Sequence, residues 1–146
     1  MSDLLALYQE TILDHGRSPR NFGRCEHPSH EARGYNPLCG DDLTITLELD
    51  GDTIRSVRFE GSGCAISTAS ASLMTEALLG RTKADVEPLF EAVHALCTTG
   101  AHHKGDLGKL VVFGGVANFP MRVKCATLGW HTMKAALEGG ESITTE

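Results

Sequence analysis

The sequence predicts an α+β fold in which helices cover one face of a small antiparallel sheet. Apolar and polar residues alternate from Leu43 to Leu49, the turn signal Asp50-Gly51-Asp52 comes next, and a returning strand runs from Thr53 to Glu60. Elsewhere, apolar residues recur at helical spacing. Because a sheet with one apolar face needs a covering layer, we expect the helices to supply it.

Length and composition indicate one globular domain over residues 1–146. Hydrophobic residues make up 41% of the chain and charged residues 22%. The net charge of −6 and the aromatic content of 5% argue against a nucleic-acid partner. The sequence contains no run of about 18 apolar residues, the length needed to span a membrane. The acidic Asp3 and Glu10 near the N-terminus do not fit a signal peptide. We expect a cytoplasmic protein with reduced cysteines and a frayed tail over residues 142–146.

The first half of the chain should contain one helix and three strands. A short amphipathic helix is expected from Ser2 to Gly16, where the glycine can end it. Residues Ser29 to Tyr35 are expected to form an edge strand. In the last of the three strands Val57 and Phe59 face inward, whereas Ile54 is out of phase with them.

The second half of the chain should contain three helices. The first begins after Cys64 and ends at Gly80, and its many small residues should let it pack closely on the sheet. The second runs from Asp85 to Leu96. The third comes after Cys125 and is stopped by Gly139-Gly140. Cys64 and Cys125 are thus expected at or near helix N-termini, where free N–H groups and the helix dipole favour the thiolate.

The loop Asn36-Pro37-Leu38-Cys39-Gly40-Asp41 contains a thiol and a carboxylate two positions apart. Pro37 restricts its own backbone, and Gly40 can take angles that are closed to other residues. Cys39 and Asp41 can therefore point toward one position instead of opposite sides of a strand. A thiolate and a carboxylate on a tight loop would make half of a metal site.

Three of the five cysteines lie where the chain enters or leaves a structured element: Cys39, Cys64 and Cys125. If these junctions meet at one end of the fold, three thiolates and Asp41 form a four-ligand set suited to zinc or to an iron–sulfur cluster. On the pattern alone, unrelated core cysteines remain an alternative. The other two cysteines, Cys25 and Cys97, are expected to be structural.

Four blocks of sequence, in order, carry a family resemblance: Asp14-His15 with Ser18-Pro19-Arg20-Asn21, then Asn36 to Asp41, Gly61 to Ser67, and Arg122 to Trp130. Together they resemble the IscU/NifU N-terminal family of iron–sulfur cluster assembly proteins, over nearly the whole chain. Two features resemble its SufU branch. Lys124 stands where the IscU branch has a histidine ligand. The segment 98–120 looks like an insertion, and we expect its His102 and His103 in a solvated loop.

The resemblance implies a three-stranded antiparallel sheet with helices packed on one face. It implies that Cys39, Asp41, Cys64 and Cys125 bind Zn²⁺. It further implies a zinc-dependent sulfurtransferase, or sulfur carrier, that depends on its partners. Such a protein accepts persulfide sulfur on Cys39 from a SufS-type cysteine desulfurase and passes it to a SufB-containing scaffold complex. A histidine of the partner would replace Cys39 on the zinc.

Two other functions stay open on the sequence. One is an IscU-like scaffold on which a [2Fe–2S] cluster is assembled, which Lys124 disfavours because it removes an expected ligand. The other is an interaction module with a purely structural zinc. In the sulfur carrier and in the structural-zinc module alike, three thiolates and a carboxylate around a divalent ion leave a formal charge of about −2. We expect Arg122 and Lys124 to offset part of it, and Lys124 to tune the site without binding metal.

Overall fold

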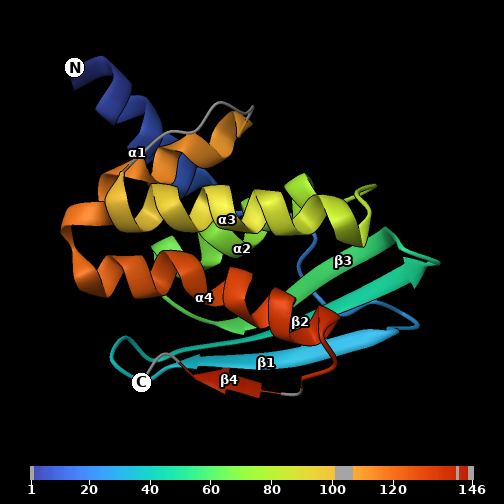
Figure 1. The fold of residues 1–146 in the computed structure, drawn as a ribbon. Coiled ribbons are helices and arrows are strands. Elements are labelled where there is room, and N and C mark those ends of the chain that lie inside the picture. The colour runs from blue at the N-terminus through green and yellow to red at the C-terminus, as the bar shows by residue number, and fades with distance from the viewer. Residues whose placement is uncertain (1, 101–106, 141, 145–146) are drawn as a thin grey trace.

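The computed structural model describes residues 2–100, 107–140 and 142–144 (Figure 1). Within them, four strands form one mixed sheet in the order β3-β2-β1-β4. Strands β1 to β3 pair antiparallel, and β4 runs parallel to β1. Their bounds are β1 His30–Asn36, β2 Asp41–Asp50, β3 Thr53–Ser62 and β4 Ser142–Thr144.

The short strand β4 corrects two predictions. The sheet is not three-stranded and purely antiparallel, because β4 pairs with β1 at Gly34↔Ile143. β1 is consequently not an edge strand, and residues 142–144 are not a frayed tail; the rest of that tail lies outside the described residues. Only Ile143 of the three β4 residues is partly buried. So short and polar a segment has no readable periodicity, and its pairing depends on tertiary structure that brings it to β1.

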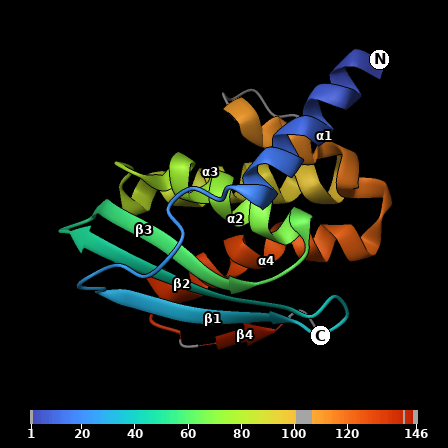
Figure 2. The same ribbon diagram turned by 180° about the vertical axis from the view of Figure 1, so that it is seen from behind.

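The helices lie on one face of the sheet, as predicted (Figures 1 and 2). α2 and α4 contact the strands, while α1, α3 and the 3₁₀ helix η1 pack on those two helices. Their bounds are α1 Ser2–Arg17, α2 Ala65–Leu78, α3 Lys83–Thr99, η1 Gly108–Asn118 and α4 Pro120–Leu137. No helix in the described part of the chain combines the length and apolarity needed to cross a bilayer. His102 and His103 lie outside the described residues.

The alternating strands bury the residues expected from their period. Leu43, Ile45 and Leu47 of β2 are shielded from solvent, as are the inward-facing residues of β3. Ile54 is buried as well, although it is out of phase with Val57 and Phe59. The reason is a register shift at Glu48/Leu49, where β3 has one residue more than β2. The alternation of inward and outward side chains along β3 therefore reverses at this point.

A close approach of α4 to β1 positions the end of the sheet. A Cβ on Gly34 would clash with Oγ1 of Thr132 on α4, so only glycine fits there. Small residues also let α4 pack closely against α2: a Cβ on Gly129 would lie 3.4 Å from the Cβ of Ala71. Residues 32, 34 and 36 of β1 face the helices by strand alternation. Asn36, the last of them, therefore lies beneath α4.

Candidate metal centre

One end of the sheet gathers three separate stretches of chain. Figures 1 and 2 show the β1–β2 loop and the starts of α2 and α4 at this same end. Cys39 lies in the loop, Cys64 directly precedes α2, and Cys125 lies in α4. Cys39 and Cys125, which are 86 positions apart in sequence, are thus brought into contact here.

The thiols of Cys39 and Cys125 touch, with their Sγ atoms 3.3 Å apart. One ligand atom from each of Cys39, Asp41 and Cys125 lies within 4.8 Å of the others. Cys64 adjoins this trio, because its backbone N–H donates to Oδ1 of Asp41 at 2.8 Å. Its Sγ accepts the N–H of Ser67 at 3.4 Å and caps α2, as expected for the predicted helix start. Three of the four predicted ligand residues therefore form one group, and Cys64 lies beside it without belonging to it.

Asp41 is a buried carboxylate without a cationic partner among the described residues. Its Oδ1 accepts the N–H of Cys64, and its Oδ2 accepts Nδ2 of Asn36 at 3.1 Å. These bonds orient both oxygens while leaving each with a further lone pair. Burial of an uncompensated carboxylate is costly, so the arrangement favours a cation beside it.

Burial raises the pKa of the Cys125 thiol, and the neighbouring thiols of Cys39 and Cys64 and the Asp41 carboxyl raise it further. Without a cation this sulfur therefore stays protonated at neutral pH. A divalent metal reverses that preference, because it binds the thiolate directly. Two thiols and one carboxylate lie within 4.8 Å of one another, and the thiol of Cys64 interacts with that of Cys125; such a donor set suits a tetrahedral zinc ion. The residues present thus fit the metal that the sequence pattern suggested.

Cys39 occupies the least constrained position of the four. Its backbone N–H donates to the carbonyl of Asn36 at 3.3 Å, which closes the loop. Gly40 has a φ of +73°, a left-handed conformation that glycine adopts without strain. Cys39 is partly exposed, and its neighbour Leu38 is 61% exposed. The loop expected from the sequence therefore presents a thiol at the surface of the centre.

The position of Cys125 differs from the predicted one. α4 begins at Pro120, so Cys125 lies in its second turn and is buried, not at the helix opening. Of the two predicted tuning residues, Lys124 is partly exposed beside it in sequence. The guanidinium of Arg122 lies over the ring of Phe119 at 4.4 Å. An apolar stripe alone did not reveal that the helix starts five residues earlier with a proline at its first position.

Two cysteines lie away from the centre, in the structural positions expected of them. Cys25 lies in the connector between α1 and β1, where it is buried and its Sγ donates to the carbonyl of Thr46 at 3.3 Å. Cys97 is fully buried in α3, and burial raises its pKa to about 12.

Two further side chains at the centre were not predicted from the sequence. Asn36 is fully buried and its Nδ2 also donates to Sγ of Cys125, at 3.5 Å. Ser67 is buried too, and its hydroxyl has no partner among the described residues. A Cβ on Gly63 would lie 3.0 Å from Oδ1 of Asp41 and 3.1 Å from that hydroxyl. Continuing the period of β1 to its last residue would have found Asn36 on the buried face.

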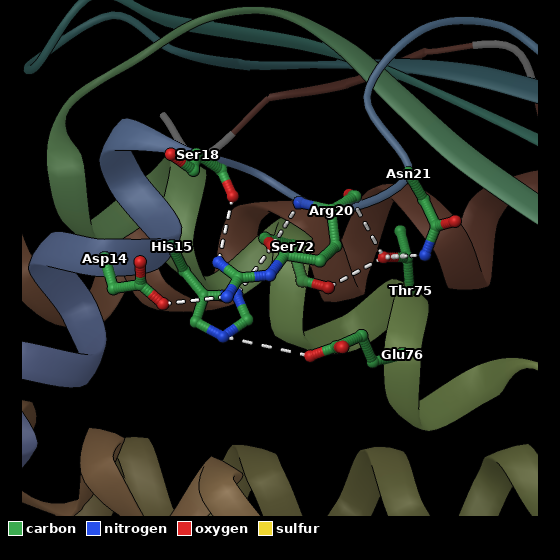
Figure 3. Close-up of polar contacts among 8 residues, drawn as sticks. All are labelled: Asp14, His15, Ser18, Arg20, Asn21, Ser72, Thr75 and Glu76. Carbon is green, nitrogen blue, oxygen red and sulfur yellow. Dashed lines mark hydrogen bonds and ion pairs between the residues drawn. The ribbon is translucent and has the colours of Figure 1, made fainter.

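A second polar cluster joins the Asp14-to-Asn21 block to α2 (Figure 3). Nδ1 of His15 lies 2.7 Å from Oγ of Ser72, which also accepts the backbone N–H of Arg20 at 2.8 Å. Nδ2 of Asn21 donates to Oγ1 of Thr75 at 3.0 Å. We call these five residues, His15, Arg20, Asn21, Ser72 and Thr75, the His15 clasp. The clasp gives this block of the sequence a physical role: it anchors the end of α1 and the connector to α2.

Comparison with known proteins gives a consistent family. The protein-family model of the NifU-like N-terminal domain matches residues 7–138 of this chain. The chain is 38% identical to the zinc-dependent sulfurtransferase SufU of Bacillus subtilis, over 95% of this chain and 97% of that protein. It is 35% identical to the iron–sulfur cluster assembly scaffold protein IscU of Streptococcus pyogenes, over 94% and 87% respectively.

Solved structures show the same fold. A candidate iron–sulfur cluster assembly scaffold protein for the SUF system from Fervidobacterium islandicum superposes with a TM-score of 0.84 at 36% identity, covering 90% of this chain and 97% of that one. The N-terminal part of a NifU-like protein from Brucella abortus has a TM-score of 0.81 at 20% identity, covering 90% and 92%, which compares the fold alone.

Proposed function

Because this chain belongs to the family of NifU-like N-terminal domains, we propose that it works in iron–sulfur cluster assembly as a zinc-dependent sulfur carrier. Cys39, Asp41, Cys64 and Cys125 would hold the zinc, and Cys39 would accept the sulfur. The coarser role, cluster assembly of the SufU or IscU type, is common to the relatives found by sequence and by structure. The finer role rests on the asymmetry of the centre.

That asymmetry is the observation that carries the proposal. In the described chain, Sγ of Cys125 and Sγ of Cys64 each accept a nitrogen-bound hydrogen, from Asn36 and Ser67 respectively. Within the same residues, Sγ of Cys39 accepts only the thiol of Cys125. Donated hydrogen bonds stabilise negative charge on sulfur and reduce its nucleophilicity. Cys39 is therefore the sulfur with the fewest donated hydrogen bonds, and it is partly exposed, as Cys64 is, whereas Cys125 is buried.

The chemistry needed is transfer of one sulfur atom between thiols. When bound, zinc would hold the three thiols deprotonated at neutral pH. The Cys39 thiolate attacks the terminal sulfur of a cysteine persulfide on the donor protein. A new S–S bond forms at Cys39 as the donor's S–S bond breaks, and the donor cysteine leaves as a thiolate. The exchange has no net oxidation, so it needs no further reactant.

Exposed apolar side chains flank this end of the fold and support docking of a second protein there. Leu38 is 61% exposed beside Cys39, and Phe119 and Met121 are 47% and 53% exposed at the start of α4. Apolar groups of this size on a surface are typical of protein contacts. The partners proposed are a SufS-type cysteine desulfurase as donor and a SufB-containing scaffold as acceptor.

The test is to mix the zinc-loaded protein with a SufS-type desulfurase and cysteine and to weigh the intact chain. We expect a gain of about 32 Da per transferred sulfur, lost in Cys39→Ala. Cys97→Ala is the matched control, because Cys97 lies outside the centre and should leave the gain unchanged. No mass gain on the wild-type chain, or a gain that persists in Cys39→Ala, would refute the carrier.

A scaffold for a [2Fe–2S] cluster is the second candidate, favoured by the names of the IscU relatives. The same three sulfurs could bind iron instead of zinc. The two candidates differ in the protein as purified. A carrier should be colourless with one zinc per chain, whereas a scaffold should be brown and keep its visible absorption through anaerobic gel filtration.

A further inference from the structure

The side-chain amide of Asn36 joins two of the proposed zinc ligands. Its Nδ2 donates to Oδ2 of Asp41 at 3.1 Å and to Sγ of Cys125 at 3.5 Å. An amide nitrogen carries two hydrogens, so both are engaged. Asn36 is 0% exposed. An amide in this position therefore acts on the centre from inside the protein, where hydrogen bonds are least weakened by water.

The backbone dictates this placement. Asn36 and Asp41 are direct partners across the β1–β2 ladder, at the base of the loop that carries Cys39. Cys125 comes from α4, which lies against β1 because Gly34 leaves no side chain in the way. The amide consequently links the base of the hairpin to the helix above it. Cys39 lies beyond this link, on the loop itself.

The donors around the centre divide its residues into two groups. Both oxygens of Asp41 are held, by Asn36 and by the N–H of Cys64. Cys125 is held by Asn36, and Cys64 by the first turn of α2. No nitrogen of the described chain donates to the sulfur of Cys39. Three ligands thus keep their positions by hydrogen bonds of the protein, and one does not.

We propose that Asn36 is a positioning residue that holds Asp41 and Cys125 in place while Cys39 leaves the metal, so that sulfur is accepted on Cys39 alone. This inference rests on the proposed zinc centre and adds the reason for its selectivity. Partners that orient metal ligands commonly contribute 10–100-fold to metal affinity, roughly the effect expected here.

The variant Asn36→Leu tests it, because leucine has a similar size but donates no hydrogen bond. In competition with a chelator of known affinity, we expect the variant to bind zinc roughly 10–100-fold more weakly than the wild type. With zinc bound, limited alkylation and peptide mapping should show Cys125 reacting earlier relative to Cys39 than in the wild type. A structural defect elsewhere would not change that order.

The matched control is Asn21→Leu. Asn21 also donates its amide to a side chain, Oγ1 of Thr75, but in the His15 clasp. Its variant should lose stability while keeping the wild-type zinc affinity and alkylation order. Wild-type affinity and order in Asn36→Leu would overturn the proposal. If a wild-type chain binds no zinc, the proposed centre itself fails, which is a different result.

A second measurement needs no variant. In the zinc-loaded wild type, the side-chain amide protons of Asn36 should exchange with solvent far more slowly than those of Asn21, which is only partly buried. Slow exchange would support the proposal even if Asn36→Leu did not fold. Equally fast exchange at the two amides would contradict it.

Discussion

The cysteine centre and the His15 clasp both attach α2 to the rest of the fold through buried polar groups, but they satisfy those groups differently. In the clasp, the Ser72 hydroxyl forms hydrogen bonds with both His15 and the backbone N–H of Arg20. The Thr75 hydroxyl accepts a hydrogen bond from the side-chain amide of Asn21. In the centre, thiols and a carboxylate face one another, and the described residues supply no cation to them. The clasp is complete within the chain, whereas the centre needs something from outside.

That difference distinguishes a structural cluster from a functional one. Buried polar groups that find neutral partners rigidify a fold and need nothing more. In the centre, burial and the neighbouring thiols and carboxyl raise the pKa of Cys125, and a cation would favour its thiolate instead. If the proposed zinc centre is correct, the same helix carries a permanent attachment along its middle and a metal-dependent one at its start. The two attachments should respond separately to metal, to acid and to substitution.

Removing the metal should lower the free energy of unfolding more than any other change, and it should do so through the centre and leave the clasp intact. Zinc held at a thousand times its dissociation constant adds about 4 kcal/mol to the free energy of unfolding. Chelation should therefore lower the unfolding midpoint of the wild type in calorimetry, while Asp41→Ala should respond much less. Superimposable wild-type curves with and without chelator would show that the centre does not depend on a cation.

Local patterns predicted the parts of the centre that the chain builds locally. The Cys39-Gly40-Asp41 loop and the capping position of Cys64 are encoded by glycine, proline and helix-start signals in a few consecutive residues. Their meeting with Cys125 was only a conditional hypothesis until the family resemblance implied it, because it depends on how α4 crosses the sheet. Periodicity within a segment carries no information about the angle between segments.

The features that sequence reasoning missed were decided by tertiary contact. β4 is three residues long and exists because α4 delivers the chain to β1. The true start of α4 at Pro120 moves Cys125 from a helix opening into a buried turn. The role of Asn36 needs both its strand phase and its helix neighbour. Each of these features combines two elements that are far apart along the chain.

Ser72→Ala should break the clasp without affecting the centre. The substitution leaves Nδ1 of His15 and the N–H of Arg20 without their shared partner, which costs roughly 1–3 kcal/mol of stability. Zinc content should stay at one per chain. Ser67→Ala is the matched control, in the same helix and equally buried, but its hydroxyl has no partner in the described chain. It should cost little, and an equal loss in both variants would contradict the clasp.

Acid should weaken the clasp through His15. Burial lowers the pKa of this imidazole, nearby Arg20 and Lys109 lower it further, and Glu76 and Asp14 partly oppose them. The unfolded chain then binds the proton more readily, so stability falls as pH drops below about 6.5. In metal-free protein, His15→Gln should remove that part of the fall, at most about 1.4 kcal/mol per pH unit. Parallel urea-unfolding profiles from pH 7 to 5 would refute a role for His15.

Lys124→Ala should have the smallest effect, because it changes the charge near the centre and none of its ligands. Lys124 adjoins Cys125 in sequence and is partly exposed, so solvent and salt screen its charge. We expect zinc to stay bound and sulfur acceptance to slow by roughly two- to fivefold, since an anionic persulfide then meets an uncompensated anionic site. High salt should narrow the difference. Lys134→Ala is the control on the same helix, because Lys134 pairs with Glu87 instead. Loss of zinc in Lys124→Ala would show that Lys124 supports the ligands and does more than tune their charge.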